Sequence, residues 1–439
     1  MLEKPSVNQQ GHLEIGGVDA VWLSKTYGTP LYIYDVRKIR EKAAAFQAAF
    51  ADLPVRYQVA YASKAFSTIA MIQLVDELGL ALDVVSGGEL YTALRAGFPA
   101  ERIHFHGNNK SLEELRYAVR ENIGAIVVDN FYELELLKTV SREIGKPVNI
   151  LLRLTPGVGA DTHAYISTGQ DDSKFGFYLS TGDARKAYRA ALTDDRFHLV
   201  GLHFHIGSQL FTPDAHVLAV QRLYKELEQW KSEFGWLPNV LNVGGGFGIA
   251  YTDGDEPTEP RRFIRPIVEA VLAECRARSL EVPEIWIEPG RAIVGEAGTT
   301  LYTIGSRKTT SGQKTFIAVD GGMTDNLRPA LYQSKYEAII ANRADQTARE
   351  RVTIAGKCCE SGDILIEDID LPEARPGDIL AVFCTGAYGY AMANNYNRLP
   401  RPAVVFVEDG EARLVVERET FEDLIRHDLP LRDPARSRS

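Results

Sequence analysis

From about residue 55 to residue 291, short apolar runs alternate with stretches whose apolar residues recur at helical spacing. The runs are nearly continuous and rich in Val, Ile, Leu and aromatic residues, which is typical of strands buried on both faces of a parallel sheet. We count eight runs, at residues 57–62, 80–85, 103–106, 125–129, 148–154, 200–205, 240–243 and 285–288. This alternation constrains the fold more than any other feature of the chain.

A helical stretch follows each run except the last. Ser111 and Glu114 form a capping-box signature before one of these stretches, and Gly145 follows another, at residues 131–144. Strand–helix alternation implies right-handed parallel crossovers, and eight such units in roughly 250 residues have the size of a (β/α)8 TIM barrel. An open, doubly wound sheet is the alternative, and the number of strands favours the barrel.

After residue 291 the pattern changes to short β-like runs separated by glycine and proline turns. These runs predict a mainly antiparallel β-sandwich. A further β-like run at residues 31–34 precedes the barrel, and we assign it to this second domain. We therefore expect an α/β chain with a barrel at residues 36–291 and a β-sandwich domain formed by both chain ends, residues 1–35 and 292–439.

Composition narrows the class of protein. The 439 residues include 49 Lys and Arg and 59 Asp and Glu, a net charge of −10, which argues against a broad nucleic-acid-binding face. The first 17 residues lack the apolar region of a signal peptide, and no run approaches the length of a membrane span. Four cysteines are too few for a disulfide scaffold and indicate a reducing compartment. We expect a cytoplasmic protein without membrane or nucleic-acid partners.

Polar residues follow several of the predicted strands, at the end of a barrel where function is found. Lys64 follows the first strand; most such lysines are solvated loop charges, but a buried one becomes a Schiff-base nucleophile. The glycine run 244–246 and Ser208 suit a phosphate, although glycines alone also make flexible turns. Glu288 suits a ring nitrogen or a simple ion pair. Together these are the parts that a pyridoxal phosphate site requires.

Other polar residues allow competing interpretations. Histidines on two strands suggest metal ligands or core packing, but without a carboxylate cluster the metal case is weak, and we expect no metal. A flat ring stacked on a flat cofactor is the better functional interpretation of His205. In the second domain, Arg328 suits a surface ion pair as well as a substrate carboxylate, and Cys359 suits an inert core thiol as well as a reactive one.

These residues lie in motifs that together resemble the diaminopimelate decarboxylases, which are alanine-racemase-like, group IV, fold type III enzymes that depend on pyridoxal 5'-phosphate. The resemblance covers about residues 28–428. Its motifs are YASKAF (61–66), DVVSGGEL (83–90), HFHIGSQ (203–209), NVGGGFGIAY (242–251), EPGR (288–291), the segment 320–332, CCESGD (358–363) and CTGAYGYAMANNYN (384–397). Phe66 departs from the pattern, since many relatives have Asn there, but it lies beyond the lysine.

The resemblance implies a role for each matching residue. Lys64 would hold the cofactor as a Schiff base, with Asp83 nearby, His205 stacked on the pyridine ring and Glu288 on its nitrogen. The phosphate would be held by Ser208, Gly245, Gly246 and the backbone of Gly290 and Arg291, and Tyr388 would also touch the cofactor. The substrate would be bound by Arg291, Arg328, Tyr332, Glu360 and Tyr388.

The resemblance also implies the reaction and the assembly. The enzyme, a lyase, would decarboxylate meso-2,6-diaminopimelate at its D-centre to L-lysine, the last step of lysine biosynthesis. Its active sites would be shared across a homodimer, with Cys359 of the partner subunit returning the proton. Two alternatives keep the fold: an amino-acid racemase, which would use a tyrosine base where this chain has Cys359, and a non-catalytic cofactor carrier, against which the intact Lys64 argues.

Overall fold

The computed structural model describes residues 5–158 and 173–431. These residues form two compact units. The first unit comprises the described residues 37–158 and 173–297, and the second comprises residues 5–36 and 298–431. Each unit is described by itself below.

The first unit is built around a closed parallel barrel of eight strands. Strand β8 pairs with β9 at Ile126 and Ile150, which closes the sheet in the order β9-β11-β12-β13-β5-β6-β7-β8. This closure confirms the predicted TIM-like barrel and excludes the open sheet. The strands are β5 (Tyr57–Ala62), β6 (Ala81–Val84), β7 (Ile103–Phe105), β8 (Ala125–Val128), β9 (Val148–Thr155), β11 (Phe197–Phe204), β12 (Val240–Asn242) and β13 (Glu284–Ile287), and the short β10 (Phe177–Tyr178) pairs with β9.

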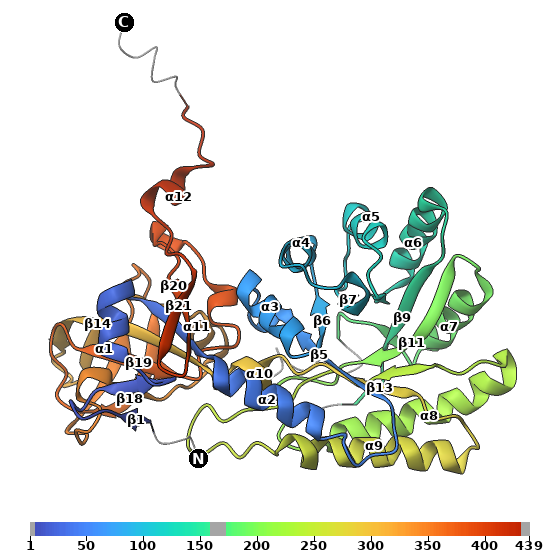
Figure 1. The fold of residues 1–439 in the computed structure, drawn as a ribbon, viewed down its shortest axis with the longest axis horizontal. Coiled ribbons are helices and arrows are strands. Elements are labelled where there is room, and N and C mark those ends of the chain that lie inside the picture. Colours follow the sequence, from blue (N-terminus) through green and yellow to red (C-terminus); the bar gives the residue numbers. More distant parts are fainter. Residues whose placement is uncertain (1–4, 159–172, 432–439) are drawn as a thin grey trace, which may run out of the picture. The chain divides into compact units, whose positions relative to one another are not determined.

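Helices surround these strands in Figure 1. The predicted capping box is confirmed, because the Ser111 hydroxyl accepts from the N–H of Glu114 and the Glu114 carboxylate accepts from the N–H of Ser111. Gly145 ends α6 in the left-handed region, as a helix-ending glycine does. The helices are α2 (Val36–Ala48), α3 (Ile69–Glu77), α4 (Gly87–Arg95), α5 (Leu112–Arg120), α6 (Phe131–Ile144), α7 (Asp183–Thr193), α8 (Asp214–Phe234), α9 (Pro260–Ala277) and α10 (Arg291–Val294).

The second unit contains a mixed, mainly antiparallel sheet. Strand β4 (Leu31–Asp35), from the N-terminal part of the chain, pairs antiparallel with β14 and parallel with β20, so both ends of the chain contribute strands. The pairing of β15 with β17 is also parallel. The other strands are β14 (Gly298–Thr309), β15 (Thr315–Val319), β16 (Ala338–Ile340), β17 (Glu350–Ala355), β18 (Ile364–Leu371), β19 (Ile379–Phe383), β20 (Ala403–Glu408) and β21 (Glu411–Val416).

Smaller elements complete the second unit. A three-stranded sheet consists of β1 (Ser6–Val7), β2 (Leu13–Ile15) and β3 (Val18–Asp19). Helices α1 (Ala20–Tyr27), α11 (Arg328–Tyr332) and α12 (Phe421–Ile425) lie in the same unit.

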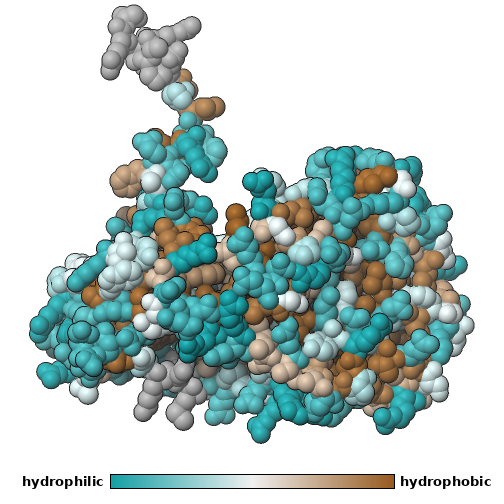
Figure 2. All heavy atoms as spheres, viewed as in Figure 1, coloured by the Kyte–Doolittle hydropathy of each residue, from teal (hydrophilic) through white to brown (hydrophobic). Residues whose placement is uncertain are grey.

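Hydrophilic and hydrophobic residues are interspersed on the face of each unit that Figure 2 shows. Within the residues that the structure describes, no helix is both long enough and apolar enough to cross a membrane.

Candidate active site

Lys64 lies in a single 3-10 turn, Ser63–Ala65, directly after β5. The Glu89 carboxylate accepts from the Ser63 hydroxyl at 3.1 Å and from the N–H of Val85 at 2.7 Å. Burial raises the pKa of Glu89, and these hydrogen bonds and the charge of Lys64 oppose that shift. Glu89 therefore ties the Lys64 turn to the end of the neighbouring strand β6.

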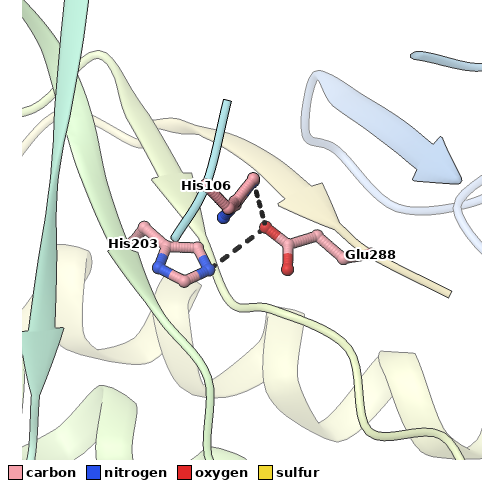
Figure 3. Close-up of side chains that lie close together, drawn as sticks. All are labelled: His106, His203 and Glu288. Carbon is pink, nitrogen blue, oxygen red and sulfur yellow. Dashed lines mark ion pairs between the residues drawn. The ribbon is translucent and has the colours of Figure 1, made fainter. Parts of the chain in front are cut away.

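Glu288, directly after β13, is the centre of a buried polar cluster (Figure 3). Its Oε1 accepts from the Asn242 side-chain amide at 2.7 Å and lies 3.1 Å from Nε2 of His203 and 3.4 Å from Nε2 of His106. Burial alone would raise the pKa of Glu288, but the facing His203 and His106 outweigh it and keep the pKa well below its ordinary value. Glu288 is therefore a charged carboxylate inside the barrel.

The two histidines of the cluster, His106 and His203, are open to two interpretations. Burial lowers the pKa of His203 to about 4, so its ring is neutral at neutral pH, with Nε2 3.1 Å from Oε1 of Glu288. His106, His203 and Glu288 offer ligand atoms within 4.8 Å of one another, a spacing that suits a metal ion as well. Because the amide N–H of Asn242 points at Oε1, we interpret the cluster as a hydrogen-bonded anion.

Asp83 on β6 joins the same cluster. Its Oδ1 lies 3.1 Å from Nδ1 of His104 and 3.4 Å from Nε2 of His106, so His106 stands between Asp83 and Glu288. His104 stacks on Trp286, with ring centroids 4.4 Å apart. His106, directly after β7, thus connects the two buried carboxylates.

His205 follows β11 and has a defined tautomer. Its Nδ1 accepts from the N–H of Gly245 at 3.2 Å, which leaves the ring proton on Nε2. Burial lowers the pKa of His205 well below its ordinary value, and the nearby charge of Lys64 adds to that shift. A neutral ring is therefore fixed beside the glycine run.

The glycine run after β12 makes close backbone contacts. A Cβ atom at Gly244 would lie 2.4 Å from the carbonyl oxygen of Phe204, and one at Gly245 would lie 2.3 Å from that of Glu288. Gly246 has a φ of +97°, in the region that favours glycine. Only glycines fit here, so backbone rather than side chains lines this turn.

Residues from the ends of β11 and β13 meet next to this turn. The Arg291 guanidinium donates to the Ser208 hydroxyl at 2.8 Å and to the Tyr251 hydroxyl. Gly290 packs closely on the end of β5, where a Cβ atom would lie 2.9 Å from Ala62. The predicted residues of the first unit thus gather at the carboxyl ends of the barrel strands.

The second unit holds a separate group of predicted residues. The buried Arg328 donates to the Tyr336 hydroxyl at 2.9 Å and to the Ser334 hydroxyl at 3.1 Å. Its guanidinium carbon lies 5.6 Å from the ring centre of Tyr332 and 5.8 Å from that of Tyr388. Arg328 is therefore an oriented cation close to two aromatic rings.

A loop of the same unit presents Cys359. Cys359 is exposed, and its backbone N–H donates to the side-chain oxygen of Asn397 at 2.7 Å. The buried Asp363 carboxylate accepts from the N–H groups of Cys358 and Met323, at 2.8 and 2.6 Å. Glu360 is exposed and accepts from the N–H of Gly362. Asp363 thus fixes the loop that carries Cys359.

Comparison with known proteins identifies the family. Residues 36–295 match the family model described as "Pyridoxal-dependent decarboxylase, pyridoxal binding domain". The diaminopimelate decarboxylase of Bacillus subtilis (strain 168) is 60% identical over 425 residues, which are 97% of each chain. The chain belongs to the diaminopimelate decarboxylase family.

Further similarities agree with this assignment. The diaminopimelate decarboxylase of Staphylococcus aureus (strain COL) is 46% identical over 422 residues, 96% of this chain and 98% of the other. The solved structure of the diaminopimelate decarboxylase from M. jannaschii in co-complex with L-lysine matches with a TM-score of 0.90 and 35% identity, over 98% of this chain and 99% of that one. As a member of this family, the chain is a pyridoxal-phosphate-dependent decarboxylase.

The residues at the barrel end fit this decarboxylase's cofactor. Pyridoxal phosphate presents an aldehyde, a ring nitrogen and a phosphate, which call for an amine, a carboxylate and an anion-binding turn. The first unit supplies Lys64, the charged Glu288 and a backbone-lined turn at Gly244–Gly246. The donor chemistry therefore matches all three groups of the cofactor.

Sequence reasoning missed several residues that organise this decarboxylase's site. Asn242, Glu89 and Asp363 lie inside the motifs that carry the family resemblance, but no role was predicted for any of them. A signal exists for Asn242, because an Asn two residues before a glycine turn often accepts from that glycine's N–H. Its Oδ1 does accept from Gly244, at 2.9 Å.

Proposed function

We propose that the chain decarboxylates meso-2,6-diaminopimelate at its D-centre to L-lysine and CO2, the last step of lysine biosynthesis. The observation that carries this proposal is the barrel end, where Glu288 is held charged by Asn242, His203 and His106. Lys64 and a glycine turn lie at the ends of strands of the same barrel. The family membership and the lysine complex of the M. jannaschii relative support the substrate.

Each residue of the barrel has a place in this proposal. The Lys64 amine would hold the cofactor covalently through its aldehyde carbon. Glu288 would hold a proton at the ring nitrogen, and His205 would face the ring. The phosphate would be held by Ser208, Gly245, Gly246, Gly290 and Arg291, and Asp83 would act through His106.

When bound, the cofactor supplies an electron sink for the pair released as CO2 leaves. Glu288 can support that role because a carboxylate stabilises the protonated ring nitrogen through a charge-assisted hydrogen bond. His205 is neutral and so adds no positive charge at the ring face. The charges of the barrel residues therefore suit decarboxylation.

Residues of the second unit would recognise the substrate. Arg328 already donates to two hydroxyls from a buried position, and a guanidinium can grip a carboxylate with two parallel hydrogen bonds. With Arg291, Tyr332, Glu360 and Tyr388 it would bind the second carboxylate and the distal amine of the substrate. Ornithine and lysine have a distal amine but lack the second carboxylate. The Cys359 thiol would return a proton to the α-carbon.

We further propose a homodimer with shared active sites, in which Cys359 and Glu360 serve the partner's barrel. The exposure of both residues suits a role across an interface. We assign residues 36–291 to the cofactor-binding domain, with residues 1–35 and 292–439 in the second; the family-model match at 36–295 supports this division. Among the described residues no cysteine forms a disulfide, which suits a cytoplasmic enzyme.

A substrate panel tests the proposal. The purified protein, loaded with pyridoxal phosphate, should release CO2 from meso-diaminopimelate and not from ornithine, arginine or L-lysine. Lys64→Ala is the matched inactive control. Turnover of ornithine or arginine without turnover of meso-diaminopimelate would contradict the substrate assignment. Racemisation of alanine in place of CO2 release would contradict decarboxylation itself.

A further inference from the structure

Asn242 connects the two ends of the proposed cofactor site. It is fully buried at the end of β12. Its side-chain N–H donates to Oε1 of Glu288 at 2.7 Å, and its side-chain oxygen accepts from the N–H of Gly244 at 2.9 Å. One amide therefore contacts both the carboxylate and the first residue of the glycine turn.

The contacts of Glu288 explain why this matters. Asn242, His203 and His106 all address the same oxygen, Oε1. A carboxylate held at one oxygen has a fixed plane, which leaves Oε2 as the oxygen that can face a ring nitrogen. Among the three contacts the one from Asn242 is the shortest, and an amide donates at every pH at which proteins fold.

We propose that Asn242 is a positioning residue for the cofactor. It orients Glu288 toward the ring nitrogen and at the same time sets the glycine turn that would receive the phosphate. The spacing between these two groups is thereby fixed before the cofactor binds. This inference rests on the proposed cofactor roles of Glu288 and the glycine turn.

The chain offers a matched control for a test at this position. Asn342 in the second unit also donates its side-chain N–H to a carboxylate, Asp378 Oδ1, at 2.9 Å. Its side-chain oxygen also accepts from a backbone N–H, that of Ile379, at 2.9 Å. Asn242→Asp and Asn342→Asp therefore make the same chemical change in the same bonding pattern, and only the first touches the proposed site.

The experiment measures binding of two probes to the full-length apo-protein by tryptophan fluorescence. One probe is pyridoxal phosphate, and the other is its 1-deaza analogue, in which C–H replaces the ring nitrogen. Asn242→Asp keeps the acceptor for Gly244 but places a second carboxylate against Glu288. Pyridoxal phosphate should bind about tenfold or more weakly, the loss expected for one hydrogen bond to a charged group, whereas the analogue should bind nearly as in the wild type.

The possible outcomes distinguish a failure of this inference about Asn242 from a failure of the proposed cofactor role of Glu288. If the wild type does not prefer pyridoxal phosphate to the analogue, the proposed role of Glu288 is wrong. If the wild type shows the preference and Asn242→Asp keeps it in full, the role of Asn242 is wrong. Should Asn242→Asp fail to fold, Asn242→Ala decides instead: it should weaken both probes, and wild-type affinity for both would overturn the inference. Asn342→Asp should match the wild type.

Discussion

Two adjacent thiols, Cys358 and Cys359, have different surroundings. Burial and the neighbouring Asp363 raise the pKa of Cys358 to about 11, whereas Cys359 is exposed on the loop surface. If Cys359 returns the proton, Cys359→Ala should lower kcat by about a hundredfold, as loss of a general acid does. Cys358→Ala is the matched control and should keep most of the activity. Equal losses in the two variants, measured by CO2 release, would exclude this assignment.

Lys64 carries a prediction that does not depend on turnover. Because its amine would bond covalently to the cofactor, borohydride reduction should attach pyridoxal phosphate to the peptide containing Lys64, as read by mass spectrometry. Lys64→Ala should lose both this attachment and CO2 release. The control is Lys186→Ala, which changes an exposed lysine paired with Asp183. Attachment at another lysine in the wild type would refute the role of Lys64.

At the scale of elements, α8 supports the glycine turn through one buried residue. His216 is fully buried, and its Nε2 lies 3.1 Å from the carbonyl oxygen of Gly245. Burial lowers the pKa of His216 to about 4. Between pH 6.5 and pH 4, His216 is therefore protonated in the unfolded chain but neutral in the folded barrel. The barrel should lose stability as the pH falls through this range.

This prediction can be measured by urea unfolding, followed through the barrel tryptophans Trp230, Trp236 and Trp286. Between pH 7 and pH 5, His216 alone should lower the free energy of unfolding by about 2 kcal/mol. His216→Gln can still donate a hydrogen bond to the Gly245 carbonyl but does not titrate. Its free energy of unfolding should therefore fall by about 2 kcal/mol less than that of the wild type between the two pH values. If the free energy of unfolding changes equally with pH in the wild type and in His216→Gln, the role of His216 is wrong. His203 and His205 are present in both proteins and so contribute equally to both.

The sequence predicted the barrel strands because their periodicity is a direct consequence of burial on two faces. Strand β5 (Tyr57–Ala62) begins and ends where the apolar run does, and α6 (Phe131–Ile144) ends at its glycine. Strand β18 (Ile364–Leu371) was not predicted, because Glu367, Asp368 and Asp370 interrupt its apolar residues. The parallel pairing of β15 with β17 depends on contacts distant in the chain, which local patterns do not encode.

In the candidate site, too, local sequence patterns could be predicted and contacts between distant residues could not. Lys64, Glu288 and the glycine turn could be predicted, because their residue types are unusual after buried strands. Asn242 could be predicted only in part, since its contact with the N–H of Gly244 is local in the sequence, whereas its contact with Glu288 exists only in the folded barrel. The same holds for Glu89, whose partners Ser63 and Val85 belong to neighbouring strand ends.

At the scale of the whole molecule, shared active sites predict complementation. Lys64→Ala and Cys359→Ala should each be nearly inactive alone. After the two are mixed and allowed to exchange subunits, about a quarter of the wild-type activity should return, because half the dimers are mixed and each of these has one complete site. Two copies of Lys64→Ala treated identically are the control. If activity stays absent although mass measurement shows mixed dimers, Cys359 does not act across the interface.

The central claim is tested most directly by meso-diaminopimelate labelled with carbon-13 in the carboxyl group of its D-centre only. The holoenzyme should release labelled CO2 and leave L-lysine without label, at equal rates. Labelled D-lysine with unlabelled CO2 would show attack at the other centre, and no CO2 from either centre would contradict the whole account.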